Sequence, residues 1–148
     1  AKKATKELEK TIDSIIALGG MVGGIGDNNC CVAAAHAVHN GLTVLPETHE
    51  LLHGEKVAFG NLVQLQLENY EAEFYELLSL LNKLDQPVSL AKLGLENAAE
   101  KDLAKVAAKS CIPEESIHNL PFAVTEKAVL EAIINADDKA EKFLAELK

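Results

Sequence analysis

The chain has 148 residues, the size of one ordinary domain, and 48% of them are hydrophobic. We therefore expect a single domain over residues 1–148 with a core of its own. The 14 basic residues are outnumbered by 23 acidic ones. A formal charge of -9 disfavours contact with a phosphate backbone, so we expect no nucleic-acid partner.

The cysteines and the apolar runs bear on the cellular location. Cys30, Cys31 and Cys111 are an odd number and show no CxxC spacing. No signal peptide and no apolar run of about 18 residues are present, so no membrane segment is expected. Together these features predict a reduced, cytoplasmic protein without a membrane partner.

The first predicted element is an amphipathic helix over residues 2–18, where apolar side chains recur at three- and four-residue spacing. We expect it to stop at Gly19 and Gly20. The glycine-rich stretch GGMVGGIGDNN that follows is expected to be a loop. After it, CCVAAAHAVHNGL predicts a short helix with small side chains, ended by Asn40 and Gly41.

The rest of the chain repeats the helical period. Helices are predicted over residues 55–68, 71–84 and 97–110, and a last one runs from the cap residue Thr125 to the C-terminus. Pro87 and Pro113 separate these segments. Because strand-type alternation persists nowhere, the predicted fold class is all-α, a helical bundle.

The glycine-rich stretch also raises the question of a dinucleotide-binding turn. Such a turn joins a strand to a helix and needs the GxGxxG spacing. Here the stretch follows a predicted helix, and Gly24-Ile25-Gly26 lacks the third glycine. The context therefore disfavours phosphate binding by this segment.

Histidine clustering is the stronger signal. His36, His39, His49 and His53 fall within 18 residues, and only His118 follows them. His36 and His39 share one helix face, so they can converge with His53 on one divalent metal ion. Because catalytic metal sites take three protein ligands, a carboxylate is also needed. The alternative is that these histidines cap helices or satisfy buried carbonyl groups.

Other candidate ligands are weaker. Cys30 and Cys31 lie at adjacent, divergent helix positions, where cysteine usually behaves as a small buried hydrophobic residue. Glu55 lies close enough in sequence to His53 to support that ring from behind.

At these residues a family resemblance is evident. The segment AAAHAVHNGLTVLPETHELLHGEKVAFG, from Ala33 to Gly60, resembles the metal-site segment of the iron-containing alcohol dehydrogenase family, in particular its glycerol dehydrogenase branch. The resemblance continues through NLVQLQLEN, LAKLGL and IHNLPFAVT, and so covers nearly the whole chain.

The resemblance implies a two-domain enzyme that binds NAD or NADP on an N-terminal α/β domain. The helical C-terminal domain of such enzymes supplies an Asp and two or three His to zinc or iron(II). By motif, His36 and His53 resemble the two histidine ligands, and His39 resembles a catalytic residue that lines the nicotinamide pocket and relays a proton. The NAD-binding domain and the helix with the ligand Asp are absent from the 148 residues.

The expected function is therefore that of the metal- and substrate-binding domain of an NAD(P)-dependent oxidoreductase, which oxidises a polyol such as glycerol or a related small hydroxy compound. We expect a homo-oligomer with a small-molecule alcohol as substrate, and an isolated chain without activity. Two alternatives remain open: a non-catalytic helical fragment or oligomerising module, and the same domain of a hydroxy or oxo acid dehydrogenase. The second is suggested by the stretch GMVGGIGDNN, which resembles family members that act on such acids. Asp27 in this stretch stands where glycerol dehydrogenases have an aromatic residue, and it would disfavour an anionic substrate unless its side chain points away.

Overall fold

The structure is a computed structural model that describes residues 4–26 and 31–147. Within these ranges the chain forms helices joined by loops, without a strand, so the all-α prediction is confirmed. The chain divides into two units, Ala1–Val32 and Ala33–Lys148, each described by itself below. The expectation of one domain over all 148 residues stays a prediction. None of the described helices is long and apolar enough to span a membrane.

The first unit contains helix α1, Lys6–Gly26. The helix does not stop at Gly19 and Gly20, and the loop expected at the glycines was wrong as far as Gly26. Each glycine costs a helix about 1 kcal/mol relative to alanine, which weakens the helix without ending it. Met21, Val22 and Ile25 continue the helical spacing of apolar residues through this stretch. Asp27 and Cys30 lie outside the described residues.

The second unit holds the remaining helices. Its α-helices are α3 (Ala34–Leu42), α4 (His53–Leu67), α5 (Glu71–Lys83), α6 (Glu100–Ser110) and α7 (Glu126–Glu146). Three short 3₁₀ turns connect them, namely η1 (Pro46–Thr48), η2 (Ala91–Leu93) and η3 (Ser116–Asn119). The helices predicted from periodicity are all present, with ends within a few residues of the expected ones. At α7 the Thr125 hydroxyl accepts a hydrogen bond from the Ala128 N–H at 3.2 Å, as predicted for a cap.

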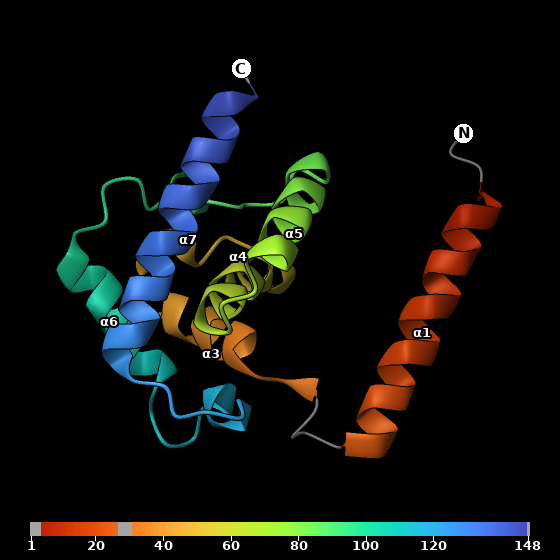
Figure 1. Ribbon diagram of the computed structural model, residues 1–148, viewed down its shortest axis with the longest axis horizontal. Helices are drawn as coiled ribbons and strands as arrows, with labels where there is room; N and C mark the ends of the chain where they lie inside the picture. Colours follow the sequence, from red (N-terminus) through yellow and green to blue (C-terminus); the bar gives the residue numbers. More distant parts are fainter. Residues whose placement is uncertain (1–3, 27–30, 148) are drawn as a thin grey trace. The chain divides into compact units, whose positions relative to one another are not determined.

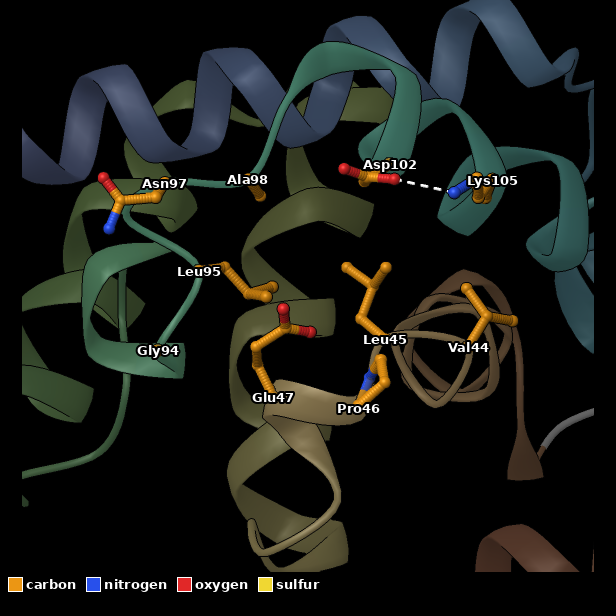
Figure 2. A pocket seen from close by; sticks show the side chains of 10 residues that line it. All are labelled: Val44, Leu45, Pro46, Glu47, Gly94, Leu95, Asn97, Ala98, Asp102 and Lys105. Atoms are coloured by element: carbon orange, nitrogen blue, oxygen red, sulfur yellow. Dashed lines mark hydrogen bonds and ion pairs between the residues drawn. The ribbon is translucent and has the colours of Figure 1, made fainter.

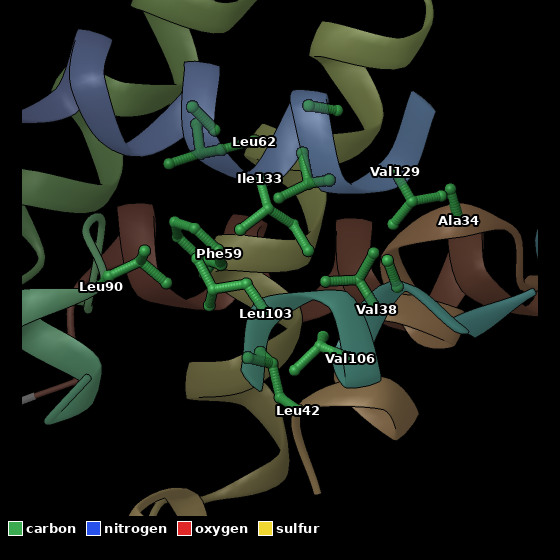
Figure 3. Close-up of a cluster of buried hydrophobic side chains, with 14 of the residues drawn as sticks. Ala34, Val38, Leu42, Phe59, Leu62, Leu90, Leu103, Val106, Val129 and Ile133 are labelled. Carbon is green, nitrogen blue, oxygen red and sulfur yellow. The ribbon is translucent and has the colours of Figure 1, made fainter. Parts of the chain in front are cut away.

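Four helices of this unit, α3, α4, α6 and α7, enclose one hydrophobic core. Helix α3 packs on α4 and α6, and α7 packs on the same two helices, while α5 lies against α4 (Figure 1). The core between them is built mostly from small and branched aliphatic side chains, with Phe59 at its centre (Figure 3). Such burial is worth about 1.5–3 kcal/mol per large side chain. This core fixes α3 relative to α4, and these two helices carry the histidines.

Candidate functional site

His36 and His39 lie on the partly exposed side of α3. The other side of α3 is buried through Ala34, Ala37 and Val38, none of which is exposed to solvent. Since residues three apart share a helix face, both imidazoles point to the same side. The small residues on the buried side of α3 let this helix pack closely against the core, so the rings of His36 and His39 lie at the edge of the core.

The helices α3 and α4 approach each other unusually closely. A Cβ atom placed on Gly60 would lie 2.4 Å from the carbonyl oxygen of Ala35, a distance that real side chains do not adopt. On its other flank α3 meets α6, where a Cβ on Gly41 would lie 2.2 Å from the Ser110 hydroxyl oxygen. Glycine at position 60 therefore sets how near α4 comes to α3, and glycine at position 41 sets how near α6 comes to α3.

The loop between α3 and α4 brings His53 back over that face. Lys56 is 6% exposed, and its ammonium group donates to the carbonyl oxygens of Thr48 at 3.1 Å and Leu51 at 3.0 Å. The Glu55 carboxylate accepts from the Leu52 N–H at 2.6 Å. Glu55 thus caps the start of α4, which differs from the supporting role behind His53 that the sequence suggested. These three hydrogen bonds hold the first turn of α4 in place.

Three of the clustered histidines meet. The ring centroids of His36 and His53 are 5.4 Å apart, and those of His39 and His53 are 4.3 Å apart. The Nδ1 atom of His53 lies 3.2 Å from Nε2 of His39, within hydrogen-bond distance. The structure therefore brings the rings of His36, His39 and His53 together, and their role as metal ligands stays a prediction.

The surroundings of His36 and His39 favour the neutral form of these two rings. Burial lowers the pKa of His36 below 6.5, and the adjacent His53 lowers it further. Burial is also the main cause that lowers the pKa of His39; His53, Lys56 and His36 add to it, while the hydrogen bond with Asn40 opposes it. A neutral imidazole keeps a free lone pair, which is the form that binds a metal ion or accepts a proton.

The other candidates lie apart from this cluster. The Nε2 atom of His49 is 3.0 Å from the Thr43 carbonyl oxygen, and that of His118 is 3.1 Å from the Ile112 carbonyl oxygen. These two histidines follow the alternative role of satisfying backbone carbonyls. Cys31 belongs to the first unit and is exposed, which differs from the buried position expected for it, and Cys111 is half-buried in the second.

The metal donor set of the chain is incomplete in the described ranges. Among residues 4–26 and 31–147, no three His, Cys, Asp or Glu side chains are arranged to hold a metal ion. His36 and His53 present imidazoles of the kind that zinc and iron(II) accept, so the residues present fit part of such a site. A third ligand is not supplied by the described residues.

A hollow of about 350 Å³ lies elsewhere on the second unit, between the loop after α3 and the start of α6 (Figure 2). Its charged residues include Asp102 and Lys105, which pair with each other at 2.7 Å. The pair is directed along the rim, where solvent reaches it. No histidine lines this hollow, and we assign the chemistry to the histidine cluster.

Sequence reasoning missed two groups next to the cluster. Asn40 follows His39 directly, and its Oδ1 atom lies 2.9 Å from Nδ1 of His39. Its amide nitrogen donates to the Glu115 carboxylate at 2.9 Å. Asn40 could have been found because it directly follows His39 in the sequence. Glu115 is 75 residues away from Asn40, and the sequence carries no signal of this contact.

Comparison with known proteins finds similarity to dehydrogenases. Glycerol dehydrogenase from Pseudomonas putida is 44% identical over 145 residues, which is 97% of this chain and 39% of that protein. Hydroxycarboxylate dehydrogenase A from Escherichia coli K12 is 42% identical, over 97% of this chain and 39% of that protein. No protein-family model matches the chain.

The fold leads to the same group of enzymes. The structure of glycerol dehydrogenase from Schizosaccharomyces pombe superposes with a TM-score of 0.79 at 30% identity, covering 95% of this chain and 42% of that one. The chain is thus a relative of metabolic dehydrogenases and spans about two fifths of their length. The resemblance to the glycerol dehydrogenase-like branch of the iron-containing alcohol dehydrogenase family is confirmed over nearly the whole of this chain.

Proposed function

We propose that this chain is the metal- and substrate-binding part of an NAD(P)-dependent oxidoreductase that oxidises glycerol or a related small polyol. The observation that carries the proposal is the meeting of His36, His39 and His53 at the rim of α3 and α4. Lowered pKa values of His36 and His39 support it, because neutral rings are available as ligands and bases near pH 7.

In this proposal His36 and His53 are the metal ligands, and an anionic third ligand comes from outside the described residues. Zinc or iron(II) suits two imidazoles and a carboxylate, and when bound it polarises a substrate hydroxyl and lowers its pKa. His39, whose ring contacts His53, helps to relay the hydroxyl proton in this proposal. NAD or NADP is held by a part of the enzyme outside the 148 residues. A cytoplasmic location and a homo-oligomeric enzyme belong to the same proposal.

A second substrate class has specific support. Hydroxycarboxylate dehydrogenase A is about as similar to this chain as the glycerol dehydrogenase is, at 42% and 44% identity. A hydroxy acid is therefore the alternative substrate. It differs from a polyol by a carboxylate, which needs a cationic partner in the pocket.

Metal titration of the purified chain tests the ligand assignment. The metal-free chain is titrated with Zn²⁺ by calorimetry, together with the variants His36→Ala, His53→Ala and His118→Ala. His118 is an exposed histidine outside the cluster and serves as the matched control. We expect weak binding by the unaltered chain and by His118→Ala, and loss of binding in the other two variants. Equal binding by all four proteins would contradict the assignment.

Oxidoreductase activity is tested on the longest natural polypeptide that contains this chain. It is assayed for oxidation of glycerol and of a small 2-hydroxy acid, each with NAD⁺ and with NADP⁺, before and after chelation of metal. Glycerol oxidation that is lost on chelation and regained with Zn²⁺ or Fe²⁺ supports the polyol proposal. Turnover of the hydroxy acid alone supports the alternative, and no turnover of either overturns both.

A further inference from the structure

A hydrogen-bonded series of polar side chains links Glu115, the residue before η3, to His39 and His53. The Glu115 carboxylate accepts from the Asn40 amide nitrogen at 2.9 Å, and Asn40 Oδ1 lies 2.9 Å from His39 Nδ1. His39 Nε2 in turn lies 3.2 Å from His53 Nδ1. This series of side chains thus has the Glu115 carboxylate at one end and the Nε2 atom of His53 at the other.

The charge of Glu115 fixes the direction of the first link. Its side chain is 10% exposed, and the Lys109 ammonium lies 3.6 Å from its other oxygen, so the two groups form an ion pair. An ionised carboxylate only accepts hydrogen bonds, so the Asn40 group facing it has to be the NH₂. The Asn40 oxygen therefore faces His39, and the reversed amide would set two oxygens against each other.

The direction of the later links follows from the first. The Asn40 oxygen only accepts, so the neutral ring of His39 carries its proton on Nδ1. Its Nε2 atom is then an acceptor, and the facing Nδ1 of His53 has to be the donor. A neutral His53 ring that carries its proton on Nδ1 has none on Nε2.

We propose that Asn40 and Glu115 are positioning residues that lock His39 and His53 in the Nδ1–H tautomer and so keep the Nε2 atom of His53 open to a ligand. Neutral imidazole in water prefers the Nε2–H tautomer, so this lock reverses the ordinary state of both rings. Only the identity of the ligand as a metal ion rests on the proposed function. The tautomers themselves can be measured on the metal-free chain.

Two histidines outside the cluster supply internal controls. The Nε2 atom of His49 lies 3.0 Å from a backbone carbonyl oxygen, and that of His118 lies 3.1 Å from another. Because a carbonyl oxygen only accepts, each neutral ring carries its proton on Nε2. The structure thus assigns opposite tautomers to the two pairs of histidines within one protein.

The test is long-range ¹H–¹⁵N correlation NMR of the imidazoles in the metal-free, ¹⁵N-labelled chain at pH 8. In the unaltered chain we expect Nδ1–H patterns for His39 and His53, and Nε2–H patterns for His49 and His118. In Asn40→Ala the rings of His39 and His53 should shift to the Nε2–H tautomer, while the control rings of His49 and His118 stay unchanged. Nε2–H at His39 in the unaltered chain, or an unchanged pattern in Asn40→Ala, overturns the proposal.

A reciprocal exchange separates this role from a merely structural one. The double variant Asn40→Asp with Glu115→Gln swaps the amide and the carboxylate, so an oxygen still faces His39 and the net charge is kept. We expect it to restore Nδ1–H at both rings, and failure to restore it counts against the proposal. If Asn40→Ala does not fold, Glu115→Gln alone is used, and loss of the uniform Nδ1–H pattern at His39 is expected.

Zn²⁺ titration of the same variants adds a second readout. Loss of a group that orients a metal-ligating histidine typically lowers metal affinity about 10- to 100-fold. We expect that loss in Asn40→Ala and recovery in the double variant. If the tautomers respond as expected and Zn²⁺ binds to none of the proteins, the proposed metal function fails and the tautomer lock stands. Unchanged tautomers with His36- and His53-dependent Zn²⁺ binding give the opposite result.

Discussion

Replacing Gly60 by alanine should force α3 and α4 apart and disturb the histidine cluster. The added Cβ would lie 2.4 Å from the Ala35 carbonyl oxygen and 3.1 Å from two more backbone atoms of that residue. Ordinary contact begins at 3.4 Å, so the oxygen has to retreat by about 1 Å. It cannot do so by a rotamer change, because it belongs to the backbone of α3.

The cost follows from this geometry. Overpacking a close-packed interior costs about 1–3 kcal/mol, and a clash between two helix backbones belongs at the upper end, at about 3 kcal/mol. For a unit of this size that corresponds to a fall in Tm of roughly 10 °C. Urea unfolding followed by circular dichroism measures the free energy of unfolding, and thermal unfolding gives the Tm. Imidazole NMR should also show loss of the contact between His39 and His53, whose nitrogens lie 3.2 Å apart.

Gly54→Ala is the matched control on the same helix. A Cβ at Gly54 has nothing within 4 Å, so the substitution removes only backbone freedom from the unfolded chain. It should leave the chain as stable or raise its stability by up to about 1 kcal/mol. The reasoning is refuted if Gly60→Ala is as stable as Gly54→Ala, because α3 would then yield to α4 without cost.

Three further substitutions probe single groups. Lys56→Met leaves two backbone carbonyls of the preceding loop without their donor, which should lower the free energy of unfolding in urea by about 1–2 kcal/mol and speed amide exchange in that loop. Thr125→Ala should cost α7 about 1 kcal/mol, with Thr125→Ser as the control that keeps the cap. Burial raises the pKa of Asp137 above 3.8 despite its bond from the Leu90 N–H, so the ionised form disfavours folding. Asp137→Asn should therefore be more stable at pH 7, with the gain lost in acid below pH 3.8; a gain that persists in acid contradicts this.

Periodicity predicted the helices of the second unit well, and in the first unit it predicted α1 but not where that helix ends. The helices α5, α6 and α7 each bury one stripe against the core, so the spacing of their apolar residues follows from packing, whereas α4 is buried over a broader face. In α1 the glycines read as a break, yet the helix continues through them, and no residue of α1 is buried. Glycine only weakens a helix, and the sequence holds no measure of how much the neighbouring apolar residues offset that cost.

The candidate site was predicted to the extent that it depends on local spacing. His36 and His39 are joined by one helix face, and His53 was placed by its position at the start of α4. Glu115 was out of reach, because its contact with Asn40 closes across 75 residues through the packing of η3 on α3. Long-range polar contacts of this kind leave no periodic trace in a sequence, and the tautomers of the histidines depend on them.

The charge around His36, His39 and His53 disfavours a cation held by the described residues alone. The buried Lys56 ammonium lies near enough to His39 to lower its pKa, and its hydrogen bonds run only to carbonyl oxygens. Glu115, the carboxylate linked to the cluster, is already engaged by Asn40 and by Lys109. A divalent ion between His36 and His53 would therefore meet neutral imidazoles and a nearby positive charge, with no free anion among the described residues around it. In a partly buried site such charges are weakly screened, so firm binding requires an anionic ligand that neutralises the ion, as the proposed third ligand would.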